Sequence, residues 1–235
     1  MLKKILVAVV LVLAVGGAAL YFFVLKDDPA PKLSVGDTPA GSDAGKVVDV
    51  EGAWTVKAST ATNVGFRIQE TFIGGAAKHT AVGRTPAVSG GMTIAGTKVT
   101  KAKITADLAA IEFTDTPAGL DVANRKRAIE NAGLEIAKFP SAEFELTAPI
   151  ELEAIPKGGV TVSAKATGDL TLHGVTKSVT FTIDAKIVNG TIVVATADPV
   201  SISLADYGMT PPKFGPVADV SKTGSFEFKV TLDRA

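Results

Sequence analysis

The sequence predicts an all-β, antiparallel domain of sandwich or barrel type, preceded by an N-terminal transmembrane helix. Three observations support this prediction. Residues 5–25 contain no charged side chain, apolar and polar residues alternate with a period of two from Trp54 onward, and residues 120–134 break that alternation. Alternation gives each strand one buried and one wet face, which is typical of antiparallel sheets.

The N-terminal segment, residues 1–25, is expected to be a transmembrane signal-anchor. Its apolar part can cross a hydrocarbon layer of about 30 Å at a rise of about 1.5 Å per residue. It is also longer than the apolar core of about 7–15 residues in a cleaved signal peptide. Because lysines precede it, residues 26–235 are expected on the extracytoplasmic side of the cell membrane. Cleavage among the small residues at 14–19 would instead make the protein a secreted one.

Residues 26–51 are expected to form a flexible linker to a single β-domain at residues 52–235. The linker contains Pro29, Pro31 and Pro39 together with several glycines and serines. It lacks any apolar period, so no helix or strand is predicted there.

The composition excludes several classes of function. The formal charge is zero, with 24 basic and 24 acidic side chains, and without a basic patch nucleic-acid binding is not predicted. The absence of cysteine removes disulfides, thiolate zinc sites and cysteine nucleophiles together. The only two histidines, His79 and His173, do not have the spacing of metal ligands, so no metal site is predicted.

The strands are expected where the alternation is plainest. These segments are residues 64–69, 103–108, 143–148, 160–172, 179–186 and 226–233. Gly168 interrupts the longest run and is interpreted as a bend or a bulge. The pair Asn189-Gly190 predicts a hairpin, because both residues tolerate positive φ. His173-Gly174 is expected to play the same turn role.

The exception to the strand pattern is the segment from residue 120 to residue 134. Its alanines, arginines, lysine and glutamate tolerate or favour a helix, and Gly133 is expected to end it. About eight to ten strands, a Phe-rich apolar face and one helical insert favour a barrel wrapped around something over a sandwich.

Four blocks of the domain follow a recognisable pattern. Residues 168–181, GDLTLHGVTKSVTF, match the form G-x-L-T-[ILV]-H-G-V-T-[KR]-x-V. Residues 124–127, Leu134 and residues 139–144 look like the block R-x-x-x-L…[FY]-P-x-[AI]-x-F. Residues 206–209, followed by 217–228, look like D-[FY]-G-[ML]…V-x-[FI], and residues 54–66 fit the opening strands. These blocks resemble the YceI-like family of extracytoplasmic lipid-binding proteins over residues 52–233.

Two positions depart from the family pattern. Lys126 follows Arg125 where the family often has Asp, and Leu204-Ala205 stand where an arginine often precedes the D-[FY]-G segment. Roles that the family gives to those polar residues are therefore not carried over to this chain.

The resemblance implies an extended eight-stranded antiparallel barrel, similar to lipocalins, with a long isoprenoid chain inside. It implies binding, shielding or transport of a polyprenyl lipid or an isoprenoid quinone outside the cytoplasmic membrane. No catalysis is implied, and no cofactor other than the bound lipid. The expected partners are the membrane, through the anchor, and the lipid. A homodimer with a shared mouth is left open.

The apolar strand faces supply the candidate ligand contacts. An isoprenoid tail gains about 25 cal/mol per Å² of apolar surface removed from water, so its binding needs no reactive group. The residues predicted to line the interior are Phe66, Ile68, Ile104, Leu108, Phe144, Leu146, Leu170, Leu172, Phe181, Ile183, Phe226 and Phe228. An ordinary packed core would show the same alternation.

A second set of candidates is predicted at the barrel mouth. Arg125 and Arg127 are candidates for contact with a phosphate or quinone head, and Tyr207, Met209 and Phe214 for covering the opening. The alternatives are a solvated helix face for the arginines and an ordinary rigid loop for the other three.

Two rival functions are compatible with parts of the sequence. A barrel that serves only as a scaffold or as a stress-response interaction module would contain the same strands. A hydrolase would need His173 to act with Asp169 and a serine, but the chain has no G-x-S-x-G motif. His173 is therefore expected to be structural, with its imidazole bonded to backbone at the turn.

Overall fold

The computed structural model describes residues 27–72, 78–115, 121–152, 156–215 and 217–235. The expected anchor at residues 1–25 lies outside these ranges. Among the described helices, none is long and apolar enough to cross a membrane.

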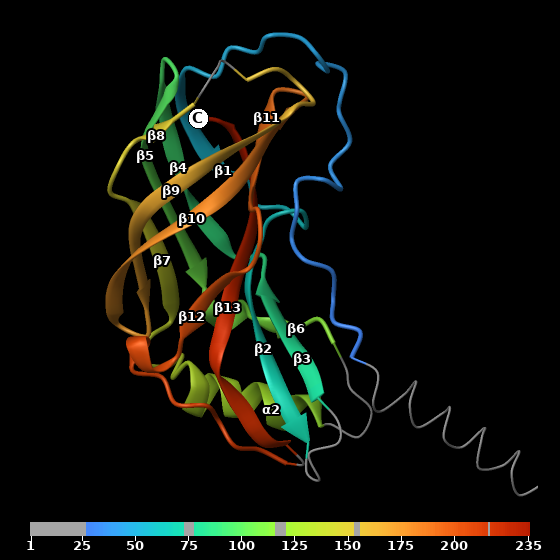
Figure 1. Cartoon of the computed structure of the whole chain (residues 1–235), viewed down its shortest axis with the longest axis vertical. Coiled ribbons are helices and arrows are strands. Elements are labelled where there is room, and N and C mark those ends of the chain that lie inside the picture. The colour runs from blue at the N-terminus through green and yellow to red at the C-terminus, as the bar shows by residue number, and fades with distance from the viewer. Residues whose placement is uncertain (1–26, 73–77, 116–120, 153–155, 216) are drawn as a thin grey trace, which may run out of the picture.

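Antiparallel strands form the body of the domain (Figure 1). Their bounds are β1 Gly52–Val56, β2 Asn63–Phe72, β3 Lys78–Thr85, β4 Val88–Ala95, β5 Lys98–Asp107, β6 Glu112–Phe113, β7 Ser141–Leu146, β8 Ile150–Glu151, β9 Thr161–Leu172, β10 Val175–Val188, β11 Thr191–Thr196, β12 Val200–Ser203 and β13 Val217–Arg234. Eight of the described strands close into a ring in the order β1-β4-β5-β7-β9-β10-β11-β13 and back to β1. The predicted eight-stranded antiparallel barrel is confirmed.

The long strand β13 extends the barrel beyond this ring. Near its C-terminal end it pairs with β1 and β11, and Leu232 lies opposite both Val56 and Ile192. Its N-terminal part pairs instead with β2 and β12, so that Phe226 lies opposite Phe66. Strands β3 and β6 continue the sheet from β2. The interior is therefore long, and it runs from β8 at one end to the helix at the other (Figure 1).

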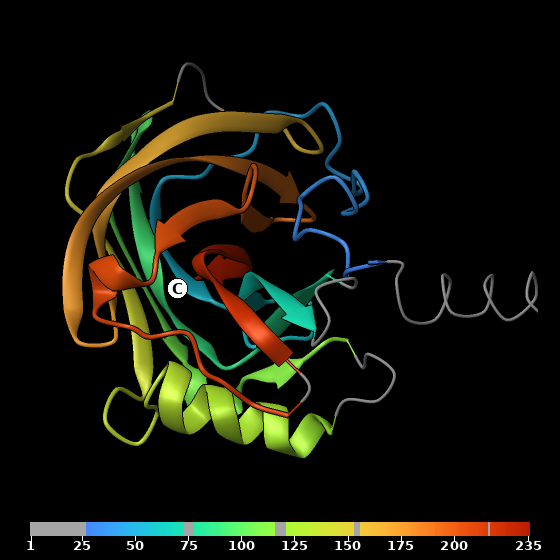
Figure 2. The same ribbon diagram turned by 60° about the horizontal axis from the view of Figure 1, so that its bottom comes forward.

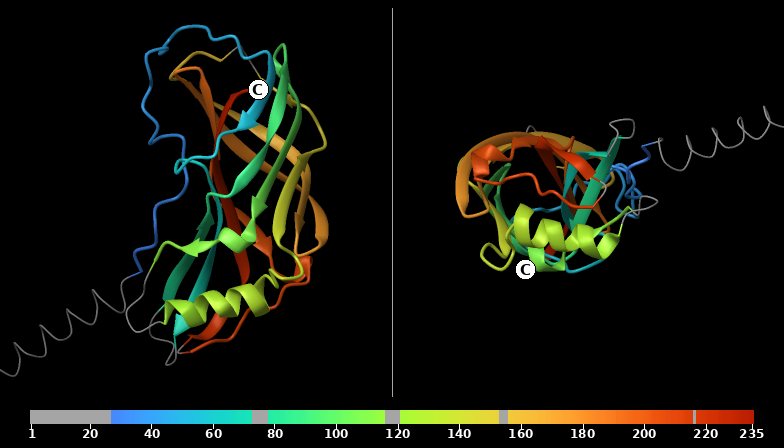
Figure 3. Two further views of the ribbon diagram at one scale, coloured as in Figure 1. Left: turned by 180° about the vertical axis from the view of Figure 1, so that it is seen from behind. Right: turned by 90° about the horizontal axis from the view of Figure 1, so that it is seen from below.

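A short helix lies across one end of the barrel, as Figures 2 and 3 show. Helix α2 (Val122–Ala128) begins after Asp121, whose carboxylate accepts hydrogen bonds from the N–H groups of the second and third following residues. It continues as a π-helical turn, η3 (Ile129–Gly133), so the predicted end at Gly133 is observed. The described residues also contain two short 3-10 turns, η2 (Leu108–Ala110) and η4 (Ala205–Tyr207).

Gly168 forms no bulge, which is one of the two alternatives in the sequence interpretation. Strand β9 pairs with β10 without a register shift across this position. A Cβ at Gly168 would lie 2.4 Å from the carbonyl oxygen of Glu145 and 2.5 Å from the Phe144 ring. The glycine is required because a neighbouring ring and backbone approach it closely, and a single strand's alternation does not reveal such a neighbour.

Both predicted turns are present. Asn189 and Gly190 join β10 to β11 with φ values of 52° and 76°, and His173 and Gly174 join β9 to β10 with 52° and 72°. Two consecutive left-handed residues are the requirement of the type I′ turn, which matches the twist of the flanking strands.

The linker runs alongside the barrel and contacts it at several points of its described part, residues 27–51, although the sequence predicts a flexible segment (Figure 1). Val35 is 2% exposed and packs with Val193 and Ala195, while Val50 is 4% exposed and joins the main core cluster. These apolar residues are isolated in sequence, so they form no period, but each meets an apolar patch on the sheet.

Two partly buried arginines hold the first part of the linker. Arg67 Nη2 donates to the carbonyl oxygen of Ala30 at 2.8 Å, and Arg84 donates to that of Pro31. Both guanidinium groups also pair with the Glu227 carboxylate, which is fully buried. The linker thus satisfies donors that would otherwise lie over a buried carboxylate without enough acceptors.

Candidate functional site

The interior contains two cavities, one toward each end of the barrel. The cavity near β8 has a volume of about 110 Å³, and the cavity near α2 has a volume of about 130 Å³. We call them the β8-end cavity and the α2-end cavity. Residues of β4, β5, β8 and β11 line the first, and residues of β2, β12, η3 and the loop after η4 line the second.

All of the residues predicted to line the interior border one of these cavities. The α2-end cavity is bordered by Phe66, Ile68, Leu108, Leu170, Leu172 and Phe226. The β8-end cavity is bordered by Ile104, Phe144, Leu146, Phe181, Ile183 and Phe228. The alternation places them inward because successive side chains of a strand point to opposite faces. Their contact with a ligand stays a prediction.

The walls are almost entirely hydrocarbon. Among the described residues, Lys186 is the one charged residue bordering the β8-end cavity, and its Nζ donates to the backbone oxygen of Thr38 at 2.8 Å. Arg67 borders the α2-end cavity, but its guanidinium is bound to Glu227 and to the linker. Neither cation is therefore free to bind an anionic group in the interior, and the cavities suit an uncharged apolar occupant.

A cluster of phenylalanines lies between the two cavities. The Phe181 ring centroid is 5.2 Å from that of Phe144, 5.4 Å from that of Phe226 and 6.1 Å from that of Phe228. The rings meet edge to face, the arrangement that their quadrupoles favour. Phe226 borders the α2-end cavity and the other three border the β8-end cavity. We call these four residues the partition.

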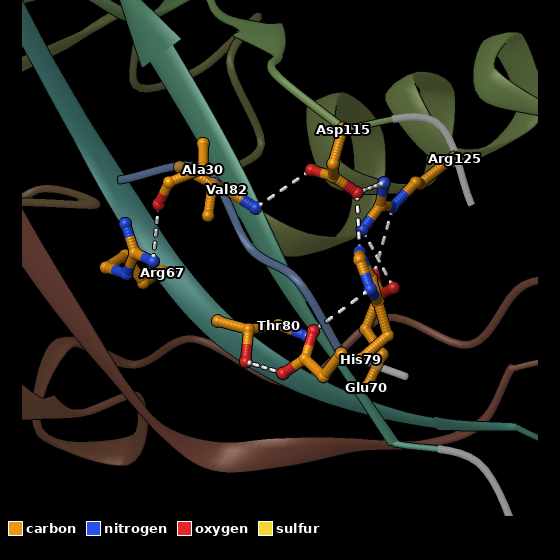
Figure 4. Close-up of polar contacts among 9 residues, drawn as sticks. Ala30, Arg67, Glu70, His79, Thr80, Val82, Asp115 and Arg125 are labelled. Carbon is orange, nitrogen blue, oxygen red and sulfur yellow. Dashed lines mark hydrogen bonds and ion pairs between the residues drawn. The ribbon is translucent and has the colours of Figure 1, made fainter. Parts of the chain in front are cut away.

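A buried charged network lies beneath α2 (Figure 4). Arg125 is 0% exposed, and its Nε and Nη2 donate to the two carboxylate oxygens of Glu70 at 3.1 and 2.8 Å. Its Nη1 donates to Asp115 at 2.6 Å, and its guanidinium carbon lies 4.0 Å from the Phe113 ring centroid. The charge of Arg125 is thereby fully engaged by protein groups.

The network continues to the edge of β3 and to the linker. His79 Nε2 lies 2.6 Å from Asp115, and its Nδ1 lies 3.3 Å from Asp27. Asp115 accepts from the backbone N–H of Val82, and Asp27 accepts from the N–H and hydroxyl of Thr80. Two aspartates thus satisfy backbone donors along an open strand edge, in the way that side chains commonly protect such edges.

The pKa values of the two carboxylates that Arg125 binds move in opposite directions. Desolvation raises the pKa of Glu70, because burial disfavours its charged form, while Arg125 acts against this shift. Burial also acts upward on Asp115, but hydrogen bonds from His79, Arg125 and the Val82 N–H outweigh it and lower the pKa. Each carboxylate is engaged by donors, so the network is a structural feature and not a set of free reactive groups.

The sequence of this barrel also matches a known protein family. Residues 54–232 match the model of the YceI-like domain. The chain belongs to the YceI-like family. None of the curated proteins compared with the chain matches it.

Solved YceI-like and related structures resemble the fold. A polyisoprenoid binding domain from Saccharophagus degradans, implicated in plant cell wall breakdown, has a TM-score of 0.56 and 18% identity, covering 79% of this chain and 100% of that one. BcnA from Burkholderia cenocepacia has a TM-score of 0.49 and 16% identity, covering 75% and 98%. A YceI protein from Campylobacter jejuni has a TM-score of 0.46 and 15% identity, covering 65% and 85%. Because the identity is only 18%, the likeness to the Saccharophagus degradans domain shows the fold alone.

The segment most typical of the YceI-like family contains the turn at His173. Its Nδ1 lies 3.1 Å from the backbone oxygen of Tyr207, and its Nε2 lies 2.6 Å from the Glu135 carboxylate. The ring centroid lies 4.3 Å from that of Phe139, with the two ring planes tilted by 52°. Both ring nitrogens are occupied, and Asp169 is not among their partners. His173 therefore joins the β9–β10 turn to the two loops beside it, as its structural interpretation expects.

The mouth candidates occupy different environments. Arg125 is buried in the charged network, neither on a solvated helix face nor available to a ligand head, because its guanidinium pairs with Glu70 and Asp115 and lies over the Phe113 ring. Arg127 is exposed, and its Nε donates to the Ala123 carbonyl at 3.3 Å. Met209 borders the α2-end cavity. These arginines, two positions apart, point to opposite sides of one helix.

The two remaining candidates pack into the domain. Tyr207 is 2% exposed, and burial, with a contribution from Asp206, raises the pKa of its phenol. Phe214 is partly buried and packs against the cluster that contains Ile68 and Val217. Its role in covering the opening stays a prediction.

Sequence reasoning missed the charged network, although one signal was available. Glu70 follows Phe66 and Ile68 at a period of two, so it continues the inward face of β2. It lies opposite His79 on β3. A carboxylate on an inward face needs a buried partner, but the sequence did not indicate which cation supplies it.

Proposed function

We propose that this protein binds an isoprenoid lipid, either a polyprenyl lipid or an isoprenoid quinone, inside its barrel and shields or carries it outside the cytoplasmic membrane. The observation that carries the proposal is the pair of interior cavities with hydrocarbon walls. An isoprenoid tail exposes only apolar surface, whose burial contributes about 25 cal/mol per Å² before ordering costs.

Family membership supports this assignment. One structural relative is itself described as a polyisoprenoid binding domain, and this chain offers the same kind of barrel with an apolar interior. Binding requires no catalytic group. Both nitrogens of His173 are engaged, and the carboxylates under α2 are held by Arg125. We therefore propose a carrier and not an enzyme.

Native mass spectrometry of the full chain tests this function. The protein would be produced in a host that makes isoprenoid lipids. One sample would be released from its membrane mimetic in the gas phase, and a second sample would be extracted with organic solvent. We expect a retained mass that matches a polyprenyl or quinone species. A chain free of lipid, which also takes up no added isoprenoid, would contradict the proposal and favour the scaffold alternative.

The linker supports a defined position of the barrel at the membrane. Asp27 is held at the α2 end by Thr80 and His79. It stands two positions after residue 25, where the predicted anchor ends, and two residues span at most about 7 Å. We propose that the α2 end faces the membrane, so that the α2-end cavity lies nearest to the lipid source.

Site-specific labelling tests this orientation cleanly, because the chain has no cysteine. Arg127→Cys places a fluorophore on the outer face of α2, and Thr97→Cys places the matched control in the exposed turn between β4 and β5. In vesicles with quencher-labelled lipid head groups, we expect stronger quenching at position 127. Equal quenching at both positions, or stronger quenching at 97, would contradict the orientation.

A further inference from the structure

The two cavities are too small, taken singly, for a long isoprenoid. Their volumes are about 110 and 130 Å³. An apolar cavity of about 150 Å³ lined by Leu, Ile and Phe binds a molecule of the size of benzene. Each cavity therefore holds about one five-carbon unit as it stands, and a longer chain must occupy both.

The partition separates the two cavities. Phe181 is its central member, because its ring meets the rings of three other phenylalanines that come from β7 and β13. It is 7% exposed. A chain that passes from the α2-end cavity to the β8-end cavity must displace this ring or one of its neighbours.

The barrel wall at this level adds little bulk of its own. Phe181 lies opposite Ala166 on β9, and the inward positions on either side of Ala166 are Ala164 and Gly168. The Phe144 ring occupies the space that a Cβ of Gly168 would need. The aromatic rings therefore fill the interior at this level of the barrel. Removing one of these rings would join the two cavities.

We propose that Phe181 is a gate that sets which lengths of uncharged isoprenoid chain this protein binds. A short chain fits one cavity and leaves the ring in place. A longer chain enters both cavities only when Phe181 turns out of the partition, and part of its binding free energy offsets that displacement. This inference rests on the proposed function, because it assumes that the interior is the isoprenoid site.

The test compares chain lengths in wild type and in Phe181→Ala. The full chain, in phosphatidylcholine nanodiscs, carries a fluorescent apolar probe that is displaced by prenol (C5), geraniol (C10) or geranylgeraniol (C20). Partition of each alcohol into the bilayer is the same for every variant, so ratios of apparent Kd remain comparable. We expect Phe181→Ala to bind the C10 alcohol, whose two five-carbon units match the two cavities, about tenfold more tightly or better, a gain of about 1.4 kcal/mol, with little change for the C5 alcohol.

Two further variants keep the test decisive. Phe181→Leu retains an apolar side chain and is expected to show a smaller gain for the C10 alcohol, which covers the case in which the alanine variant folds poorly. Phe139→Leu removes a ring outside both cavities and is expected to leave every Kd unchanged. Equal changes for short and long alcohols, or no change for either, would overturn the gate. Wild type that binds none of the alcohols would instead contradict the proposed function.

Discussion

The barrel interior and the charged network under α2 are both buried, but they are built in opposite ways. The interior collects hydrocarbon side chains from successive strands and still contains two cavities. The network collects one arginine, three carboxylates and a histidine from separate segments, and its ionic groups pair closely with one another (Figure 4). The first leaves room for a ligand, and the second leaves none.

The difference comes from the directionality of the two kinds of contact. Apolar burial depends on area and tolerates several packings, so side chains that are correct in polarity can enclose unfilled space. A buried charge is costly unless a partner satisfies it at hydrogen-bond distance, which fixes both groups in position. In this domain the apolar interior is the candidate binding site, and the charged network holds the helix and the linker in place.

Among the variants that test this contrast, Arg125→Met is expected to lower the free energy of unfolding the most. It leaves Glu70 buried without its bidentate partner, and removing one member of a buried ion pair costs about 3–5 kcal/mol of unfolding free energy. Arg127→Met is the matched control on the exposed side of α2 and is expected to change stability by less than about 0.5 kcal/mol. Urea denaturation followed by circular dichroism gives both values.

A double variant sharpens this prediction. Replacing Glu70 by Gln and Arg125 by Met together is expected to recover part of the loss, because position 70 no longer bears a buried, unpaired charge and Asp115 keeps its bonds to His79 and the Val82 N–H. If the Arg125 variant is no less stable than its Arg127 control, the network does not hold the helix and the contrast fails.

Gly168→Ala is expected to have the next largest effect, on the apolar side of the comparison. The added methyl would meet the Phe144 ring and the Glu145 carbonyl at 2.5 and 2.4 Å, and such overpacking costs about 1–3 kcal/mol. Gly133→Ala is the matched control, because the nearest atom to its new Cβ, in Pro212, is 3.6 Å away.

Thermal unfolding of the two glycine variants measures the difference. We expect a clear fall in Tm for Gly168→Ala and little change, or a slight rise, for Gly133→Ala, since alanine favours a helix. A Tm for Gly168→Ala that equals that of wild type would show that the partition adapts freely to added volume.

Much of the fold was predictable because its signals are local. The period of two marked the strands and placed Phe66, Phe181 and Phe228 on inward faces, and Asn189-Gly190 marked a turn through its tolerance of positive φ. The helix was predicted from a short run of helix-tolerant residues that ended at Gly133. Each of these inferences depends on residues within a few positions of one another.

The features that were predicted differently depend on distant neighbours. Arginine is a residue type that is usually exposed on a helix, but the carboxylate partners of Arg125 come from β2 and from the segment after β6. Gly168 is explained by a ring on β7. The linker has no period of its own and is held by Arg67 and Arg84.

The sequence by itself determined which residues face inward, because alternation along a strand is a property of the extended backbone. Only the tertiary structure decided how the inward residues meet: that four phenylalanines divide the interior, and that one arginine of two neighbouring candidates is buried with carboxylates. The physical reason is that polarity is carried by each residue singly, whereas the size of a cavity and the pairing of a charge depend on groups that only the closed barrel brings together.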